Sequence, residues 1–192
     1  VNVNIPDTFD ISTTLSYVSM FENCVSLPRV DFTPGFSRSA PSSNMPFMTN
    51  MFKNCAMLEE VLFPSHYDGS KIQGMASMFE SCVSLQEFTL PVGFTAAESH
   101  SMSRMFYDCQ ALKNVEFPST MNTVVLNDLS SMFYNCFTLA NVEMSYLTVD
   151  NVTNINAMFQ NCYAIQRLDM STWKFNSAVN ATNLFNGDTS LT

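Results

Sequence analysis

The chain has few charged residues and few glycines, and these shortages exclude several classes of protein. Of its 192 residues only 13% are charged, with 8 Lys and Arg against 17 Asp and Glu, so the formal net charge is −9. A chain without a basic stripe lacks the cations that neutralise phosphates, which disfavours nucleic acid and anionic membrane surfaces as partners. Five glycines make a phosphate-binding loop improbable. No apolar run approaches the roughly 18 residues that a membrane-spanning helix needs, so we expect no membrane insertion.

Sequence motifs of common enzymes are also missing. The sequence contains no G-x-S-x-G, no H-E-x-x-H, no P-loop and no G-x-G-x-x-G. Its two histidines, His66 and His100, stand at unrelated positions. We therefore expect no enzyme activity, no catalytic residues, no cofactor and no metal site.

What the chain does have is a repeat. A Met-Phe or Leu-Phe pair returns every 26 or 27 residues, apart from one four-residue insertion near residues 33–43, and six of the seven pairs are followed three residues later by cysteine. The copies are Met20-Phe21…Cys24, Met51-Phe52…Cys55, Met78-Phe79…Cys82, Met105-Phe106…Cys109, Met132-Phe133…Cys136, Met158-Phe159…Cys162 and Leu184-Phe185…Asp188. Self-similarity at this period is typical of a solenoid, in which one supersecondary unit stacks on the next.

One copy predicts the local structure of all of them. Met75, Met78, Phe79 and Cys82 stand at i, i+3, i+4 and i+7, the spacing of one face of a short helix. Phe88 and Leu90, two residues apart, then indicate a short strand with both side chains inward. We predict an α/β solenoid like a leucine-rich repeat: a right-handed superhelix of about seven layers, with short parallel strands on one face and short helices or 3-10 turns on the other. Residues 1–192 then form one domain that begins and ends within a repeat, with repeat cores near 17–32, 48–63, 75–90, 102–117, 129–144, 155–170 and 181–192.

The six cysteines occupy one column of this repeat. Each takes the same inward position beside Met and Phe, no C-x₂-C pair occurs, and Asp188 replaces the cysteine of the last copy. Free cysteine packs as a small apolar side chain, so we expect a ladder of buried, reduced thiols. Disulfides between adjacent layers are the alternative.

The unit resembles the repeat of a known family. The stretch Asn151–Cys162 and the stretch Leu168–Ser171 are similar to the BspA-like leucine-rich repeat, in the 26-residue form found in mycoplasma lipoproteins and in surface proteins of gut and oral bacteria. The earlier repeats depart from that pattern, since Pro64, Pro91 and Pro118 stand where Ser145 and Ser171 stand later. The resemblance implies an extracellular or cell-surface location and a role in adhesion or ligand binding, without catalytic residues.

Two sets of side chains are candidates for a binding surface. Residues that flank the inward strand positions should point outward, and six of them are carboxylates: Asp31, Glu60, Glu87, Glu116, Glu143 and Asp169. Such a stripe serves either a basic partner or a cation, or simply keeps the protein soluble as a solvated face. Aromatic and apolar residues recur in the return arms between strand and next repeat, and they either close the edge of the core or bind a ligand: Phe9, Phe36, Tyr67, Phe94, Leu147 and Trp173. Trp173, the single tryptophan, is the best candidate for an exposed anchor.

The leading hypothesis from the sequence is a non-catalytic binding or adhesion module of a bacterial surface protein. Its ligand is a protein or glycan bound on the sheet face or the return arms, and the module is a monomer or is linked to flanking domains. The alternative is an architectural role, as a spacer or as a structural component of a virion or its tail.

Overall fold

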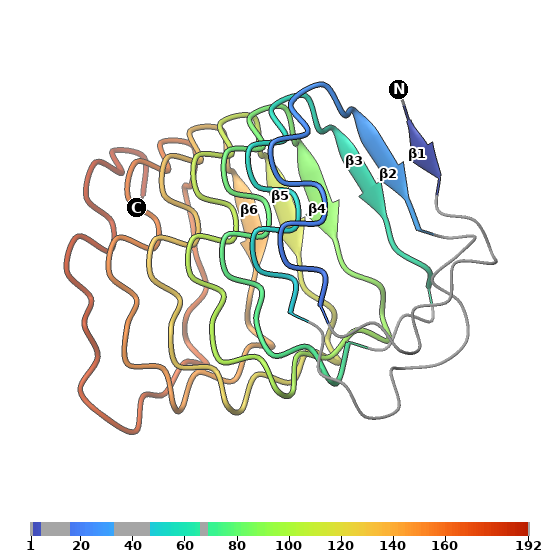
Figure 1. The fold of residues 1–192 in the computed structure, drawn as a ribbon. Coiled ribbons are helices and arrows are strands. Elements are labelled where there is room, and N and C mark those ends of the chain that lie inside the picture. The colour runs from blue at the N-terminus through green and yellow to red at the C-terminus, as the bar shows by residue number, and fades with distance from the viewer. Residues whose placement is uncertain (1, 5–15, 33–46, 66–68, 192) are drawn as a thin grey trace.

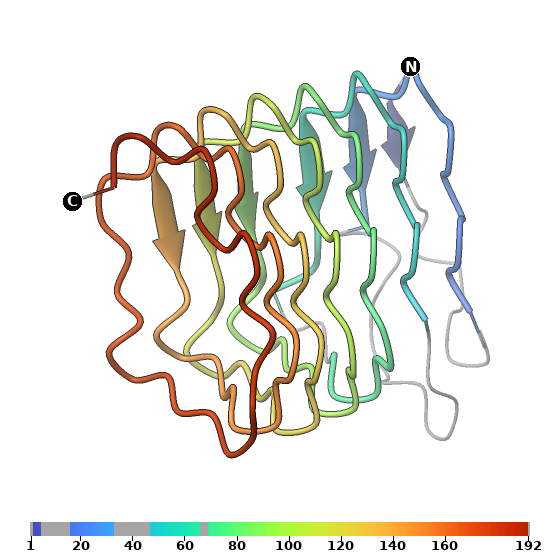
Figure 2. The same cartoon turned by 90° about the vertical axis from the view of Figure 1, so that its left-hand side faces the viewer.

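The protein is a stack of similar layers, seen from two sides in the computed structural model (Figures 1 and 2). The structure describes residues 2–4, 16–32, 47–65 and 69–191. One face carries the strands β1 (Val3–Asn4), β2 (Arg29–Asp31), β3 (Glu60–Leu62), β4 (Glu87–Thr89), β5 (Asn114–Glu116) and β6 (Asn141–Glu143). All pairs are parallel, and they form two sheets in the orders β1-β2-β3 and β4-β5-β6. The predicted parallel strands on one face of a solenoid are therefore confirmed.

The strand register follows the repeat. Val30 lies opposite Val61, and Phe88 opposite Val115, so equivalent positions of successive copies form columns. Most of the strand residues predicted to point inward are buried, among them Phe32 and Leu90. A few are half-buried: Val61, Phe63, Val142, Leu168 and Met170. Leu168 and Met170, the last pair that the repeat predicts as a strand, lie in none.

The opposite face, which we call the turn face, differs from the prediction. The expected short helices or 3-10 turns do not occur in the described part of the chain, and consecutive turns take their place. Hydrogen bonds alternate there between two kinds. Met78 N–H donates to Met75 O within its own layer at 3.3 Å, whereas Phe79 N–H donates to Met105 O of the next layer at 2.8 Å. The layers are thus joined by backbone hydrogen bonds on this face as well.

Left-handed backbone at two positions of every layer explains the absence of helices. A positive φ recurs directly before the Met or Leu of each pair, at Ser19, Asn50, Ser77, Arg104, Ser131, Ala157 and Asn183. It recurs again directly before the cysteine position, at Asn23, Asn54, Ser81, Asp108, Asn135, Asn161 and Gly187. A helix requires an unbroken run of right-handed residues, and two left-handed residues four positions apart leave no room for one. The turns still return Met75, Met78, Phe79 and Cys82 to the inner side, where all four are buried.

The core consists of columns that run the length of the stack. Seven phenylalanine rings stack in one column at centroid separations of 5.2–5.7 Å, with interplanar angles of 13° or less: Phe21, Phe52, Phe79, Phe106, Phe133, Phe159 and Phe185. The predicted burial of the cysteines is confirmed for five, and it is wrong for Cys24, which is exposed in the first layer. All six are free thiols.

Each buried thiol also has a hydrogen-bond partner in the neighbouring layer. The thiol of Cys82 donates to Phe52 O at 3.1 Å, and that of Cys109 donates to Phe79 O at 3.0 Å. Cys55, Cys136 and Cys162 repeat the contact. In the last layer a carboxylate replaces the thiol, and Asp188 Oδ1 accepts from Cys162 N at 2.6 Å. The cysteine column therefore contributes hydrogen bonds between layers as well as apolar packing.

The return arms close the edge of the core. Phe94, Leu147 and Trp173 are buried, at 1%, 4% and 9% exposure. The prediction of Trp173 as an exposed anchor is wrong: its indole N–H donates to Met144 O, and its ring meets Phe175 edge to face. Burial of the large indole ring with its N–H satisfied is the favourable arrangement for tryptophan. Phe9, Phe36, Tyr67 and the predicted insertion loop lie outside the described residues.

Candidate functional site

The sheet face presents two outward rows of side chains, one on each side of the central strand residue. The upstream row contains Arg29, Glu60, Glu87, Asn114, Asn141 and Arg167. The downstream row contains Asp31, Leu62, Thr89, Glu116, Glu143 and Asp169. The six carboxylates predicted to share this face do so, but they are divided between the rows. Leu62 and Thr89 also separate Asp31 from Glu116, so the carboxylates form short groups and not one continuous stripe.

The carboxylates at the β2 end are partly neutralised by an arginine. Arg29 Nε lies 2.7 Å from Glu60 Oε2, and its Nη2 lies 3.3 Å from Asp31 Oδ2. Further along the upstream row, Asn114 Nδ2 donates to Glu87 Oε1 at 3.3 Å, and Asn141 Nδ2 donates to Asn114 Oδ1 at 2.8 Å. These contacts link the upstream side chains of neighbouring strands to one another.

Two carboxylates of the downstream row are bound by serines two residues later. Ser145 donates from both its hydroxyl and its amide to Glu143, and Ser171 N donates to Asp169 Oδ1 at 2.9 Å. Hydrogen bonds from Ser145 lower the pKa of Glu143, and those from Ser171 lower the pKa of Asp169. The proline that follows the middle strands has no N–H to donate. The later repeats have serine where the middle repeats have proline, and it is in these later repeats that the carboxylate accepts a hydrogen bond from that residue.

Two grooves lie on the sheet face, one where adjacent strands are not hydrogen-bonded and one over bonded strands. The first, of about 400 Å³, lies between β3 and β4 and is lined by Glu59, Glu60, Val61, Leu62, Gln86, Glu87, Phe88 and Thr89. The second, of about 460 Å³, lies over β5, β6 and the following layer and is lined by Asn114, Val115, Glu116, Asn141, Val142, Glu143 and Arg167. The separation of the two groups of strands is visible in Figure 2.

The structure brings Glu60 and Glu87 to the first groove and Glu116 and Glu143 to the second. Glu116 and Glu143 are direct partners in the parallel ladder. Asp31 and Asp169 line neither groove. Glu59 and the floor residue Leu62 were missed as site residues. The doubled charge at Glu59-Glu60 is the sequence signal that could have added Glu59.

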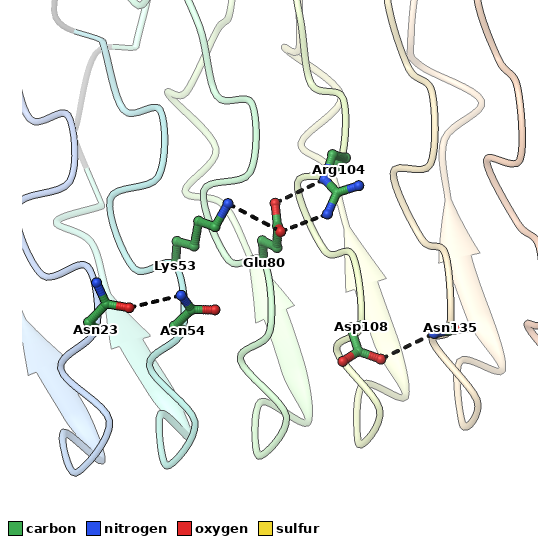
Figure 3. Close-up of polar contacts among 7 residues, drawn as sticks. All are labelled: Asn23, Lys53, Asn54, Glu80, Arg104, Asp108 and Asn135. Atoms are coloured by element: carbon green, nitrogen blue, oxygen red, sulfur yellow. Dashed lines mark hydrogen bonds and ion pairs between the residues drawn. The ribbon is translucent and has the colours of Figure 1, made fainter.

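A second polar cluster lies on the turn face and joins three layers (Figure 3). Glu80, only 6% exposed, accepts two hydrogen bonds from Arg104, at 2.7 and 3.0 Å, and lies 3.2 Å from Lys53 Nζ. Burial alone would raise the pKa of Glu80, but hydrogen bonds from Arg104, then Ser77, and the nearby cations lower it to about 2. The Arg104 guanidinium also lies 3.8 Å from the centre of the Tyr107 ring. The cluster is internally paired, so its role is to hold layers together.

A mostly half-buried ladder of amide and carboxylate side chains runs beside this cluster. Asn54 Nδ2 donates to Asn23 Oδ1 at 2.9 Å, and Asn135 Nδ2 donates to Asp108 Oδ1 at 3.3 Å (Figure 3). Asn161 Nδ2 extends the ladder to Asn135 Oδ1 at 2.8 Å. These residues occupy the left-handed position before the cysteine, so one column serves both backbone conformation and bonding between layers.

Clusters of metal-ligating side chains and long apolar helices were sought in the described ranges. No three or more His, Cys, Asp or Glu side chains gather there as possible metal ligands. Nor do the same ranges contain a helix with the length and apolar character to cross a bilayer.

Comparisons with known proteins identify similar sequences and structures. A family model described as "Mycoplasma protein of unknown function, DUF285" matches residues 38–118 and 100–192. Among curated proteins, none matches the chain. A leucine-rich cell surface protein from Faecalibacterium prausnitzii is 21% identical with a TM-score of 0.44, over 74% of this chain and 31% of its own.

Two further solved structures are similar to the chain. A leucine-rich repeat protein of T. pallidum is 18% identical with a TM-score of 0.41, over 86% of this chain and 78% of its own. One from Bacteroides ovatus is 13% identical with a TM-score of 0.31, over 91% and 82%. The chain thus spans less than a third of the Faecalibacterium protein and most of the other two.

Proposed function

The chain belongs to the DUF285 family of Mycoplasma proteins, and from this premise we propose that it is a non-catalytic, surface-displayed module that binds a protein or glycan through its sheet face. The family match confirms the sequence resemblance to the mycoplasma repeat. Display at the cell surface is the location that the BspA-like resemblance implies.

The observation that carries the proposal is the arrangement of the sheet face. It presents outward side chains in two rows. Residues of both rows line two grooves on this face. Behind the face, the stacked phenylalanines and the hydrogen bonds between layers hold the backbone. A rigid scaffold loses little conformational entropy when it binds a partner, which favours recognition.

The ionisable groups support binding over catalysis. Burial raises the pKa of the Cys55 thiol to about 11 and also raises the pKa of Cys109 well above its usual value, so neither is a nucleophile at neutral pH. The strongly perturbed carboxylate, Glu80, is saturated by Arg104 and Lys53 on the opposite face from the grooves. Thiols that stay protonated and a carboxylate that is paired with two cations are not available for proton transfer.

A binding screen with two matched variants tests the proposal. The chain is screened against extracellular-matrix proteins and a glycan array, and any ligand found is measured against Asn141→Arg on the sheet face and Gln110→Arg on the turn face. Both residues are exposed, and both changes add one positive charge. We expect Asn141→Arg to change affinity at least about fivefold and Gln110→Arg to leave it within about twofold, since contacts at an interface centre dominate binding energy. If the two variants change affinity equally, or if Gln110→Arg changes it more, the ligand does not bind on the sheet face.

An architectural spacer is the second candidate function. It is favoured by the uninterrupted phenylalanine column from Phe21 to Phe185. Such a column gives a rod that resists bending irrespective of its surface. A screen that yields no ligand, with a native chain that resists proteolysis, would favour the spacer over the binding module.

A further inference from the structure

We propose that the groove between β3 and β4 binds a lysine or arginine side chain from a basic segment of a partner protein. This inference rests on the proposed function and names the kind of ligand that the sheet face accepts.

The opening between β3 and β4 is confined to the strand face. The two strands belong to different sheets and are not hydrogen-bonded to each other. On the turn face the same two layers remain joined, since Phe52 N donates to Met78 O at 2.9 Å and Asn54 N to Glu80 O at 2.8 Å. The groove is therefore a local opening in a stack that is otherwise bonded, and backbone polar groups that pair elsewhere in the sheet lie along it.

The groove has an apolar floor and acidic sides. Val61, Leu62 and Phe88 supply its apolar surface. Glu59, Glu60 and Glu87 supply three carboxylates, and no lining residue is cationic. A lysine or arginine side chain matches this combination, because its aliphatic stem packs on apolar surface while its charged end reaches the carboxylates.

The carboxylates are held from outside the groove. Arg29 on β2 contacts Oε2 of Glu60, and Asn114 on β5 contacts Oε1 of Glu87. Each contact involves one oxygen, so each carboxylate is positioned by a neighbouring strand and still presents a second oxygen. Side chains positioned before binding lose less entropy when the cation arrives.

The second groove has similar size but already contains its compensation. Arg167 lies among its lining residues, and Ser145 binds the Glu143 carboxylate. An incoming cation there would compete with Arg167 and would meet a carboxylate already hydrogen-bonded. With Arg29 counted against Glu60, the three carboxylates of the first groove exceed its cation by two, whereas the two carboxylates of the second exceed Arg167 by one. The charge therefore favours the first groove, and the second provides a matched control.

The experiment measures binding of short Gly/Ser peptides that carry lysine, arginine or glutamate, by fluorescence polarisation at about 150 mM salt, where long-range attraction is largely screened. We expect the lysine and arginine peptides to bind and the glutamate peptide not to bind. Glu59→Gln/Glu87→Gln should weaken binding about tenfold, because it removes close charge-assisted contacts. Glu116→Gln/Glu143→Gln, which removes the same charge from the second groove, should change binding by less than about twofold.

A steric variant tests the groove without changing its charge. Thr89→Tyr adds a ring to an exposed lining residue and should abolish binding of the basic peptides, while far-UV circular dichroism and thiol accessibility stay those of the native chain. Unchanged binding by Thr89→Tyr, or equal losses in the two double variants, would overturn the inference and leave the proposed function standing.

Failure of the inference and failure of the proposed function are distinguishable. If no basic peptide binds but a screened ligand is sensitive to Asn141→Arg, the groove inference is wrong and the binding module remains. If no ligand is sensitive to any sheet-face variant, both proposals fall.

Discussion

At the scale of single residues, the most consequential side chain is Glu80. It is almost fully buried, yet it carries a charge that Lys53 and Arg104 neutralise from the layers on either side. Its pKa in the folded protein is about 2, below the ordinary 4.5, so the folded state favours the ionised form. The stabilisation is therefore complete above about pH 4.5 and is lost as the pH falls toward 2.

Glu80→Gln should lower the free energy of unfolding by about 2 kcal/mol at pH 7, since each pKa unit corresponds to about 1.4 kcal/mol and the partners are partly exposed. The difference from the unmodified chain should shrink between pH 4.5 and pH 2. Urea denaturation across this pH range measures it. Glu98→Gln, which removes an exposed pair with Lys71 at 3.8 Å, is the control and should cost no more than about 0.5 kcal/mol. A constant difference at all pH values would contradict the assignment.

The thiols give a second prediction at this scale. At pH 8 a thiol reagent should modify one cysteine of the native chain rapidly, the exposed Cys24, and all six after denaturation. Cys24→Ser should abolish the rapid phase. Burial raises the pKa of the other five, so above about pH 9 the unfolded chain ionises first and stability should fall as the pH rises. Two or more rapid thiols would show that the column is less protected than we infer.

At the scale of elements, the turn face depends on its left-handed residues. Within the described ranges, fourteen positions have positive φ, and Gly187 is the one glycine among them. Asparagine, serine and aspartate fill most of the others, and Asn and Asp tolerate this conformation better than branched residues do. The element is therefore specified by small polar residues and not by helix-forming ones.

Ser131→Val should destabilise the chain by about 2 kcal/mol, because a branched side chain is strained at the φ of 54° found there. Ser131→Gly should be close to neutral, since glycine adopts this conformation without strain. Ser130→Val, at the adjacent serine, is the matched control, because Ser130 is not among the positive-φ residues. Thermal unfolding of the three variants checks the order, and equal losses at Ser130 and Ser131 would argue against backbone strain as the cause.

At the scale of the whole molecule, stability comes from contacts between neighbouring layers. The phenylalanine column and the thiol contacts each link a layer only to the adjacent ones. In such a stack, stability is approximately a sum of terms for each layer and for each interface. A residue with neighbours on both sides should therefore matter more than the same residue at the last position of its column.

Phe106→Ala, in the middle of the column, should cost about 3–5 kcal/mol, the usual value for a buried phenylalanine. Phe185→Ala, half-buried with one stacked neighbour, should cost roughly half as much. Chemical denaturation measures both. If the two variants lose equal stability, the column does not act through its nearest neighbours.

Much of the core was predictable, and much of its conformation was not. The inward positions of Met78, Phe79 and Cys82 follow from apolar spacing, and their burial confirms it. The same spacing predicted a helix wrongly, because turns with left-handed corners return side chains to one side at the same interval. Trp173 was misplaced because nothing in its local sequence distinguishes an exposed arm residue from one that closes the core.

The sequence by itself determined the columns of the stack. Identical residue types recur at identical positions, so stacked copies must bring phenylalanine to phenylalanine and cysteine to cysteine, whatever the conformation of each layer. The tertiary structure decided how the outward carboxylates are grouped and which become accessible. That grouping depends on where adjacent strands bond and where they separate between β3 and β4. Strand spacing results from the packing of whole layers, and no single repeat encodes it.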